Sequence, residues 1–269
     1  MSTDAPVPTD PVPAGDSPHL VLPGRVVSAG RGWEWIPESW RIFVRAPVMW
    51  IISIILVFIC FVAVSLVPFL GHIASALLQP VVLAGWIVAS HSLYQGGDFE
   101  LDHLLAGFKK SFGNLVVVGL LFLLGEIVIL LIFVAFVLIS VGSAVLAAGT
   151  EEIAHVIMAS VPVFLLGGLI TLALLLPLVA AYWFAPALVV MHDMQPLDAM
   201  KASFSACFRN FVPFLVYSVV LLLLAIVAAI PFGLGYLVLV PMTLAGIYIS
   251  YRDIFTEESA PPPPKPTFA

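Results

Sequence analysis

Six long runs of apolar residues limit what this chain can fold into more than any other feature. An α-helix rises about 1.5 Å per residue, so roughly 20 apolar residues are needed to cross the hydrocarbon core of a bilayer. Of the 269 residues, 62% are hydrophobic and only 10% are charged, too few charges to cover a water-soluble globule. We therefore predict an all-α, six-helix transmembrane bundle. The predicted spans are residues 47–70, 74–93, 115–139, 156–190, 211–230 and 232–250.

The fourth run is too long for one span perpendicular to the membrane. Its 35 residues would form a helix of about 52 Å. Such a helix must tilt, break near Pro162 or Pro177, or begin at the membrane surface. Thr150 followed by Glu151 and Glu152 is typical of a helix start, because a hydroxyl caps the first turn and acids suit its positive end. We expect a helix to begin there, on the membrane surface.

Two segments outside the spans are predicted to be tails, which leaves residues 31–257 as the transmembrane domain. Residues 1–30 contain three aspartates and six prolines without any hydrophobic period, and they predict a disordered cytosolic tail. They also lack the basic segment and apolar core of a removable signal peptide. Residues 258–269 are rich in proline and predict a second cytosolic tail.

The basic residues predict the orientation of the chain. All ten Lys and Arg residues fall in the N-terminal segment, in the loops after spans two and four, or in the C-terminal segment. The loops after spans one, three and five contain none. Because basic loops stay in the cytoplasm, we expect a multi-pass protein of the bacterial inner membrane with both termini cytoplasmic.

Apolar residues recur at helical spacing immediately before spans one, three and five, with charged residues on the opposite face. A helix of this kind lies among lipid headgroups, with its rings toward lipid and its bases toward phosphate. Binding of a partner protein is the alternative. The apolar stripes are Trp33, Ile36, Trp40 and Phe43; Leu101, Leu104, Leu105, Phe108 and Phe112; and Leu197, Met200, Phe204, Phe208 and Phe211. The candidate lipid-contacting bases are Arg41, Arg45, Lys109, Lys110, Lys201 and Arg209.

The chain also contains an internal repeat. Residues 101–115 match residues 197–211 without a gap, and Pro-x-x-Leu-Ala-Gly occurs at residues 80–85 and again at 241–246. We infer three parallel hairpin repeats, each an amphipathic helix followed by two spans. Many secondary transporters use inverted repeats instead. Small residues one turn apart in these spans predict close helix packing: Gly85 with Ala89, and Gly246 with Ser250.

Glu126 is the one charged residue inside a predicted span. It lies about 16 Å from the cytoplasmic end of that span, near the centre of the bilayer. Two interpretations stay open. Glu126 could relay ions or protons or contact a substrate, as acids within membranes commonly do. It could instead be a neutral acid that is hydrogen-bonded to a hydroxyl, with Tyr182, Tyr217 and Ser218 as candidates.

The remaining His, Asp and Cys residues show no pattern that predicts a metal site, a catalytic site or a disulfide. The His and Asp residues near the cytoplasmic edge have no zinc or calcium spacing, so we expect no metal site. The chain lacks a nucleophile elbow, a phosphate-binding Gly loop and a His-Glu-x-x-His motif, so we expect neither an enzyme nor a cofactor. Cys60 and Cys207 are expected to be packing residues without a disulfide. A net charge of −6 argues against nucleic acid as a partner. The residues considered as metal ligands are His91, Asp98, Asp102, His103, His192, Asp193 and Asp198.

Three segments together resemble a known group of proteins. They are Gly-Arg-Gly-Trp-Glu-Trp at residues 30–35, the Phe-containing segment 101–114, and Ala-Pro-Ala-Leu-Val-Val-Met at 185–191 with Ala-Ser-Phe-x-Ala-x-Phe-Arg-Asn at 202–210. The chain is similar to a family of six-span proteobacterial inner-membrane proteins without an established activity. That family is distantly similar to the membrane domain of some bacterial glycerophosphodiester phosphodiesterases. The resemblance implies an inner-membrane six-helix bundle, and it assigns no functional residues.

Two hypotheses about function follow. The first is a non-enzymatic membrane protein that binds or organises lipid, other membrane proteins or copies of itself, with the bilayer as its principal partner. The second is a small-solute transporter or proton-coupled channel that uses Glu126. A membrane-embedded hydrolase is a third, weaker interpretation, because no catalytic motif supports it.

Overall fold

The structure, a computed structural model, describes residues 19–148 and 153–257. Over these residues the chain is helical, with one isolated antiparallel bridge between Leu20 and Thr256. The all-α prediction is confirmed. In chain order the helices are α1 (Arg31–Phe43), α2 (Pro47–Ser65), α3 (Leu70–Tyr94), the short 3-10 helix η1 (Leu101–Leu105), α4 (Ala106–Lys110), α5 (Phe112–Ala148), α6 (Ile153–Trp183), α7 (Ala185–His192), α8 (Pro196–Arg209), α9 (Phe211–Ala229) and α10 (Tyr236–Phe255).

Within the described residues, six helices are long and apolar enough to cross a bilayer, which agrees with the predicted number. Several predicted bounds need correction. The second span was expected from residue 74, but α3 already begins at Leu70. The third was expected to end at residue 139, whereas α5 continues to Ala148. The sixth, α10, continues past residue 250 to Phe255, because polar residues at the end of an apolar run still propagate a helix.

The long fourth run does not break at either proline. Helix α6 passes through Pro162 and Pro177 and ends at Trp183; the chain then bends at Phe184 and continues as α7. A break near one of the prolines, one of the predicted alternatives, is therefore wrong. Helices in a membrane accommodate proline when neighbouring groups satisfy the freed backbone carbonyls. The predicted helix start at Thr150, Glu151 and Glu152 lies outside the described residues.

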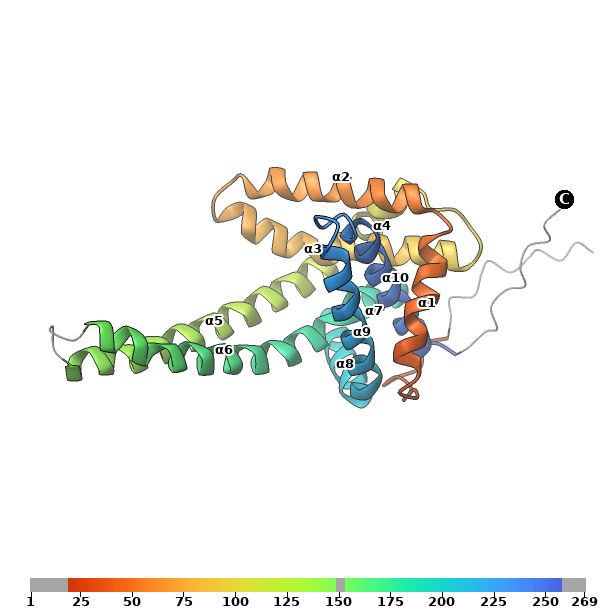
Figure 1. The fold of residues 1–269 in the computed structure, drawn as a ribbon. Coiled ribbons are helices and arrows are strands. Elements are labelled where there is room, and N and C mark those ends of the chain that lie inside the picture. Colours follow the sequence, from red (N-terminus) through yellow and green to blue (C-terminus); the bar gives the residue numbers. More distant parts are fainter. Residues whose placement is uncertain (1–18, 149–152, 258–269) are drawn as a thin grey trace, which may run out of the picture.

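Consecutive spans form three helical hairpins: α2–α3, α5–α6 and α9–α10. The hairpins α2–α3 and α5–α6 come together beside α7 and α10 and diverge away from them (Figure 1). We call the end of the molecule that contains α1, α4, α7 and α8 the closed end. The opposite end, toward which α2–α3 and α5–α6 diverge and which contains the turn after Ser65, is the open end (Figure 1).

The hydrophobic core lies at the closed end. It is formed by the C-terminal halves of α3 and α10, by α7, and by the amphipathic helices packed around them. Side chains nearer the open end face outward: Phe58 is 66% exposed, Phe69 87% and Ile139 73%. The large aromatic side chains that are fully buried all belong to the closed end; they are Trp35, Trp50, Phe184, Tyr217, Tyr248, Tyr251 and Phe255.

Glycine permits the close approach of helices in this core. A Cβ added to Gly85 of α3 would lie 2.6 Å from the Cα of Leu104 in η1. A Cβ on Gly107 of α4 would lie 2.2 Å from the carbonyl oxygen of Val81 in α3. Because both neighbours are backbone atoms, neither can move aside as a flexible side chain would.

The other predicted packing residues also belong to the closed end. Ala89 of α3 is fully buried, and so is Ser250 of α10, whose hydroxyl donates to the Gly246 carbonyl at 2.7 Å. Gly246 itself faces the side chains of Tyr217 and Ser39. These glycine and serine contacts join spans to amphipathic helices as well as to other spans.

The three amphipathic stretches become α1, η1 with α4, and α8. Their predicted apolar stripes are mostly exposed, with Phe108 42%, Phe204 39% and Phe208 57% accessible. Three members are buried instead, which corrects the predicted stripes: Phe43, Leu104 and Met200. These three face the core because each amphipathic helix also packs against a span, α1 on α10, η1 and α4 on α3, and α8 on α6. The three-copy repeat itself stays a prediction.

Residues 19–30 are ordered, which corrects that part of the predicted disordered tail; residues 1–18 and the second predicted tail, residues 258–269, lie outside the described residues. The ordered segment runs beside the end of α10: the Val21 N–H donates to the Phe255 carbonyl at 2.8 Å, and the Arg25 N–H donates to the Ile254 carbonyl at 2.7 Å. Asn210 holds the same segment through both ends of its side-chain amide, Oδ1 accepting from the Val27 N–H at 2.8 Å and Nδ2 donating to the Arg25 carbonyl at 2.9 Å. We call residues 19–28 the N-terminal strap.

An ion-pair cluster ties α1 to the end of α10 beside this strap. The Arg31 guanidinium contacts Asp253 at 2.7 Å, Glu38 at 3.0 Å and Glu34 at 2.5 Å. The Trp35 indole N–H donates to the same Asp253 carboxylate at 3.0 Å. Burial opposes the charge of Arg31, but Asp253 and the two glutamates outweigh it and raise the pKa of Arg31 above its usual value. The guanidinium therefore stays charged at any physiological pH.

A cleft between two hairpins as the candidate functional site

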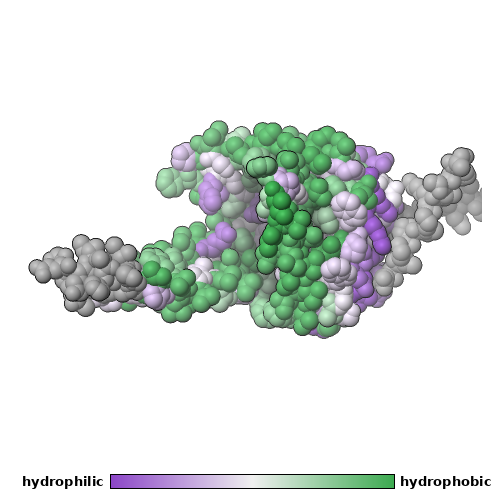
Figure 2. Space-filling view, in the orientation of Figure 1, coloured by the Kyte–Doolittle hydropathy of each residue, from purple (hydrophilic) through white to green (hydrophobic). Residues whose placement is uncertain are grey.

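The candidate site is the cleft between hairpins α2–α3 and α5–α6. Two cavities occupy it, one of about 600 Å³ against α5 and α6, and one of about 470 Å³ between α2 and α3. Two side chains, His72 and Glu126, line both cavities. Figure 2 shows hydrophilic surface on the facing sides of the two hairpins, surrounded by hydrophobic surface. The cleft is therefore apolar with a polar centre.

Glu126 reaches this centre because of how α5 crosses its neighbours. On one side, a Cβ at Gly119 of α5 would lie 2.8 Å from the carbonyl oxygen of Ala76 in α3, so the two helices touch there. On the other side, the Phe122 ring packs on the Tyr182 ring of α6 with centroids 4.6 Å apart. Glu126 lies one turn beyond Phe122, past the crossing point, where α3 and α5 have begun to separate.

The Glu126 carboxylate has no hydrogen bond or ion pair among the residues that the structure describes, although it interacts electrostatically with the Tyr182 hydroxyl. Of the hydroxyls proposed from the sequence, Tyr217 lies elsewhere, with its ring 5.7 Å from Trp35 and its hydroxyl beside Gly246. Ser218 is exposed on α9. The interpretation of Glu126 as an acid hydrogen-bonded to Tyr217 or Ser218 is therefore wrong.

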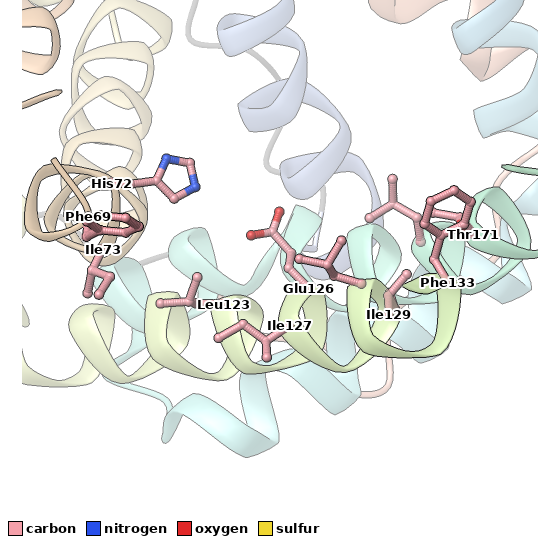
Figure 3. A pocket seen from close by; sticks show the side chains of 11 residues that line it. Phe69, His72, Ile73, Leu123, Glu126, Ile127, Ile129, Phe133 and Thr171 are labelled. Carbon is pink, nitrogen blue, oxygen red and sulfur yellow. The ribbon is translucent and has the colours of Figure 1, made fainter. Parts of the chain in front are cut away.

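The opposite wall of the cleft comes from α3. His72, Ser75 and Gln79 follow one another at spacings of three and four residues, which places them on one face of the helix. In Figure 3 the His72 imidazole and the Glu126 carboxylate project from facing helices into the space between them. Thr171 of α6 lines the same cavity. Four polar side chains from two helices, α3 and α6, thus line the cleft with Glu126 of α5.

Several polar atoms near the cleft are buried without a partner. Within the described part of the chain, the Ser75 Oγ, the Thr171 Oγ1 and the Tyr182 hydroxyl are buried and make no hydrogen bond. An unsatisfied buried polar atom costs about 1–3 kcal/mol, so native structures usually pair such groups. The cleft therefore offers hydrogen-bonding capacity that the chain itself does not use.

The sequence prediction does not include His72, because residues 71–73 lie between two predicted spans, where a turn is expected. Helix α3 begins earlier, at Leu70, and carries His72 in its first turn. The helical spacing of His72, Ser75 and Gln79 was the signal that could have identified this polar face.

The candidate lipid-contacting bases lie at the closed end, and most of them are already engaged. Lys109 pairs with Asp102 at 2.5 Å, while Lys110 and Lys201 lie 3.9 Å and 3.7 Å from Asp193 and Asp198. All three lysines are more than half exposed. The other bases are arginines: Arg45 donates to the Leu93 carbonyl at the end of α3, Arg209 donates to the Gly24 carbonyl of the strap at 3.2 Å, and Arg41 is exposed.

The His and Asp residues that were weighed as metal ligands are dispersed, and no three such groups gather among the described residues. Two of the histidines instead contact tyrosines of α10: His91 Nδ1 lies 2.9 Å from the Tyr248 hydroxyl, and His192 Nε2 lies 2.5 Å from the Tyr251 hydroxyl. Both cysteines are free thiols. Burial raises the pKa of Cys207 to about 12, so this thiol is not a nucleophile at neutral pH.

Comparison with known proteins agrees with these structural findings. The chain is 30% identical over 217 residues to a probable inner membrane protein of Burkholderia thailandensis, a match that covers 78% of each protein. No family model matches the chain. No solved structure matches it either. With six apolar helices and this extent of shared sequence, the chain belongs to the family of inner membrane proteins represented by that Burkholderia protein.

Proposed function

We propose that this inner membrane protein binds a membrane lipid in the cleft between hairpins α2–α3 and α5–α6 and that it does so without catalysing a reaction. The observation that carries the proposal is the composition of the cleft. Its walls are apolar, and its centre holds His72, Glu126 and the unpaired hydroxyls of Ser75 and Thr171. A lipid has the same division, with a polar head attached to apolar chains.

The shape of the molecule supports lipid as the occupant. The two hairpins diverge toward the open end (Figure 1), and the space-filling view shows the cleft open between them rather than enclosed by a bundle (Figure 2). A molecule already in the bilayer can enter such a cleft sideways. Its acyl chains would replace other lipid chains along the cavity walls. Because they move from one apolar environment to another, the preference for a bound lipid must come from the polar centre of the cleft.

The amphipathic helices at the closed end support a second contact with lipid. On α4 and the start of α5, the rings of Phe108 and Phe112 stack with centroids 5.8 Å apart and are both exposed. On α8, Phe204 and Phe208 form a similar exposed pair at 4.6 Å. Exposed rings beside lysines suit the boundary between headgroups and acyl chains. We propose that these helices rest on the cytoplasmic leaflet.

The cleft can be tested by filling it. Ile73 of α3 lines the larger cavity and is 45% exposed, whereas Ile59 of α2 is 58% exposed and lines neither cavity. We expect Ile73→Trp to reduce the lipid that stays bound through detergent purification at least fivefold, as counted by mass spectrometry. Ile59→Trp should leave it unchanged. Equal lipid retention in both variants and the wild type would contradict binding in the cleft.

Proton-coupled transport is a second candidate, and the placement of Glu126 opposite His72 in an open cleft favours it. In liposomes, Glu126→Gln should then abolish solute or proton flux while the protein still folds, because an amide cannot release a proton. Wild-type flux at the level of empty liposomes would remove this candidate and leave lipid binding untouched.

A further inference from the structure

We propose that His72 and Glu126 form a binding site for the zwitterionic headgroup of a phosphoethanolamine lipid. In this site the ammonium group binds the Glu126 carboxylate, and the phosphate accepts hydrogen bonds from His72. The inference rests on the proposed function, binding of lipid in the cleft, and it names the class of lipid.

The need for a cation follows from the surroundings of Glu126. A carboxylate in an apolar environment is costly unless an opposite charge or hydrogen-bond donors accompany it. The described chain gives Glu126 neither. Among the six described spans, only α10 contains a Lys or Arg, and that residue, Arg252, lies over the Tyr94 ring at the closed end. An ammonium group supplied by the ligand satisfies the carboxylate with a charge and with N–H donors.

The need for an anion follows from the facing wall. The His72 imidazole donates an N–H in its neutral form and two in its cationic form. One turn along the same face, the Ser75 hydroxyl is buried and donates to nothing among the described residues. Phosphate oxygens accept such hydrogen bonds. The two walls therefore present complementary groups to the two charges of one headgroup.

The cavities also fit a lipid with two chains. His72 and Glu126 stand where the two cavities meet, and each cavity extends from there along apolar side chains. The smaller is walled by Val57, Phe58 and Phe61 of α2, and the larger by Ile127, Leu130 and Phe133 of α5. A headgroup at the junction places one acyl chain against each hairpin.

This arrangement discriminates against other headgroups. A phosphatidylglycerol headgroup carries a negative charge and no ammonium, so it would leave Glu126 unpaired and repel it. A choline headgroup carries a cation without N–H donors, so it cannot hydrogen-bond to Glu126 or to the Thr171 hydroxyl that lines the same cavity. The ammonium group of ethanolamine carries a positive charge that pairs with Glu126, and its N–H groups can donate hydrogen bonds to Glu126 and to the Thr171 hydroxyl.

The test uses the full-length protein in nanodiscs made from equal amounts of phosphatidylethanolamine, phosphatidylglycerol and phosphatidylcholine. The protein is then transferred to detergent and the retained lipids are counted by mass spectrometry. We expect phosphatidylethanolamine to be enriched at least tenfold over phosphatidylglycerol and at least threefold over phosphatidylcholine. Glu126→Gln and His72→Leu should each reduce the first ratio to below threefold. Asp98→Asn, an exposed carboxyl outside the cleft, is the matched control and should leave both ratios unchanged.

The outcomes separate this inference from the function on which it rests. Lipid that is retained without headgroup preference, or with phosphatidylglycerol in excess, overturns the headgroup site while lipid binding stands. Wild-type protein that retains no lipid overturns lipid binding itself. If Glu126→Gln fails to fold, His72→Leu and Glu126→Asp decide the matter, since Asp keeps the charge and should preserve a partial preference. An unchanged preference in His72→Leu then contradicts the site.

Discussion

The closed and open ends of this molecule are built on different principles. At the closed end, seven large aromatic side chains are fully buried, and glycines bring backbones into contact. At the open end the two hairpins α2–α3 and α5–α6 separate from each other, although the helices within a hairpin still touch, as at Gly71 and Val64, and side chains such as Leu66 and Phe69 are mostly exposed. One end resembles the interior of a globular domain, and the other consists of separate hairpins.

This difference shows how a membrane protein can be stably folded and still keep a cleft open between two of its hairpins. A helix satisfies its own backbone hydrogen bonds, and lipid chains solvate its apolar surface as well as another helix would. The outer halves of the hairpins therefore need no packing against each other. Stability comes from the closed end, which leaves the open end available to bind a ligand. The predictions that follow test this division, from the largest expected effect to the smallest.

The largest effect concerns which end is cytoplasmic. The described ends of the chain, His19 and Glu257, lie together at the closed end, where the Glu257 N–H donates to the His19 carbonyl. The distribution of basic residues predicts that this end is inside. Reporters fused at residues 20, 100, 195 and 262 should give only cytoplasmic signals, and those at residues 72, 147 and 231 only periplasmic ones. A periplasmic signal from residue 195 would contradict six spans in this orientation.

Adding one methyl group should distinguish the two ends. Gly107→Ala places a Cβ 2.2 Å from the Val81 carbonyl oxygen at the closed end, whereas nothing lies within 4 Å of the corresponding position at Gly168 in the outer part of α6. Overpacking of this kind lowers the free energy of unfolding by about 1–3 kcal/mol. Gly168→Ala should be neutral or slightly stabilising, because alanine favours helix. Equal melting temperatures of the two variants would refute the division.

The strap should contribute to the closed end through Asn210. This side chain is 1% exposed and makes hydrogen bonds to Val27, Arg25 and Ala206. Asn210→Ala leaves two strap backbone groups unsatisfied, and we expect a loss of about 2 kcal/mol in unfolding free energy. Proteolysis within residues 19–28 should become faster. Asn114→Ala, at the matching position of residues 101–115, is the control and should have a smaller effect.

At the open end, removing a charge should cost little stability. Glu126→Leu deletes a carboxylate that has no hydrogen bond among the described residues, and it also removes the cost of desolvating that carboxylate. We expect the unfolding free energy to fall by less than about 0.5 kcal/mol, or to rise, within the usual range for sites away from packed features. Thermal unfolding in detergent measures this. A loss as large as that of Gly107→Ala would show that Glu126 is structural.

The smallest effect is expected from the exposed lysines. A basic residue near an anionic membrane surface contributes about 1 kcal/mol to membrane attraction. Lys109, Lys110 and Lys201 already lie near Asp102, Asp193 and Asp198, so each should contribute less than that. The triple replacement by Gln should weaken association with anionic lipid measurably but leave melting unchanged. Unaltered lipid association would favour protein partners for these helices.

The sequence predicted the spans because hydropathy depends on composition alone. Their ends were less predictable. Helix α5 extends to Ala148 and α10 to Phe255, since helices continue past the residues that a bilayer needs. The sequence predicts a disordered tail for the strap because residues 1–30 are rich in proline and show no hydrophobic period. Its order depends on Asn210 and the end of α10, far away in sequence, and local patterns carry no information about such contacts.

The sequence predicts one of the two central residues of the candidate site, Glu126, but not the other, His72. Glu126 was evident as an isolated charge in an apolar run, but its surroundings were not. They depend on where α5 crosses α3, at Gly119 and Ala76, and on how far the helices have separated one or two turns later. His72 belongs to the site only because α3 begins at Leu70. A shift of one residue in either helix would rotate its side chains by about 100° and turn one of these two residues away from the cleft.

The N-terminal strap has a consequence for the order in which the protein can be assembled. Its residues leave the ribosome before the first span, whereas the residues that hold the strap and α1 are made after the fourth span or later; they are Asn210, Asp253 and the backbone of residues 254–257. The first hairpin must therefore enter the membrane while its N-terminal flank is still undocked. The closed end is completed only after the final span is inserted, so a chain truncated before α10 would keep that flank accessible to proteases.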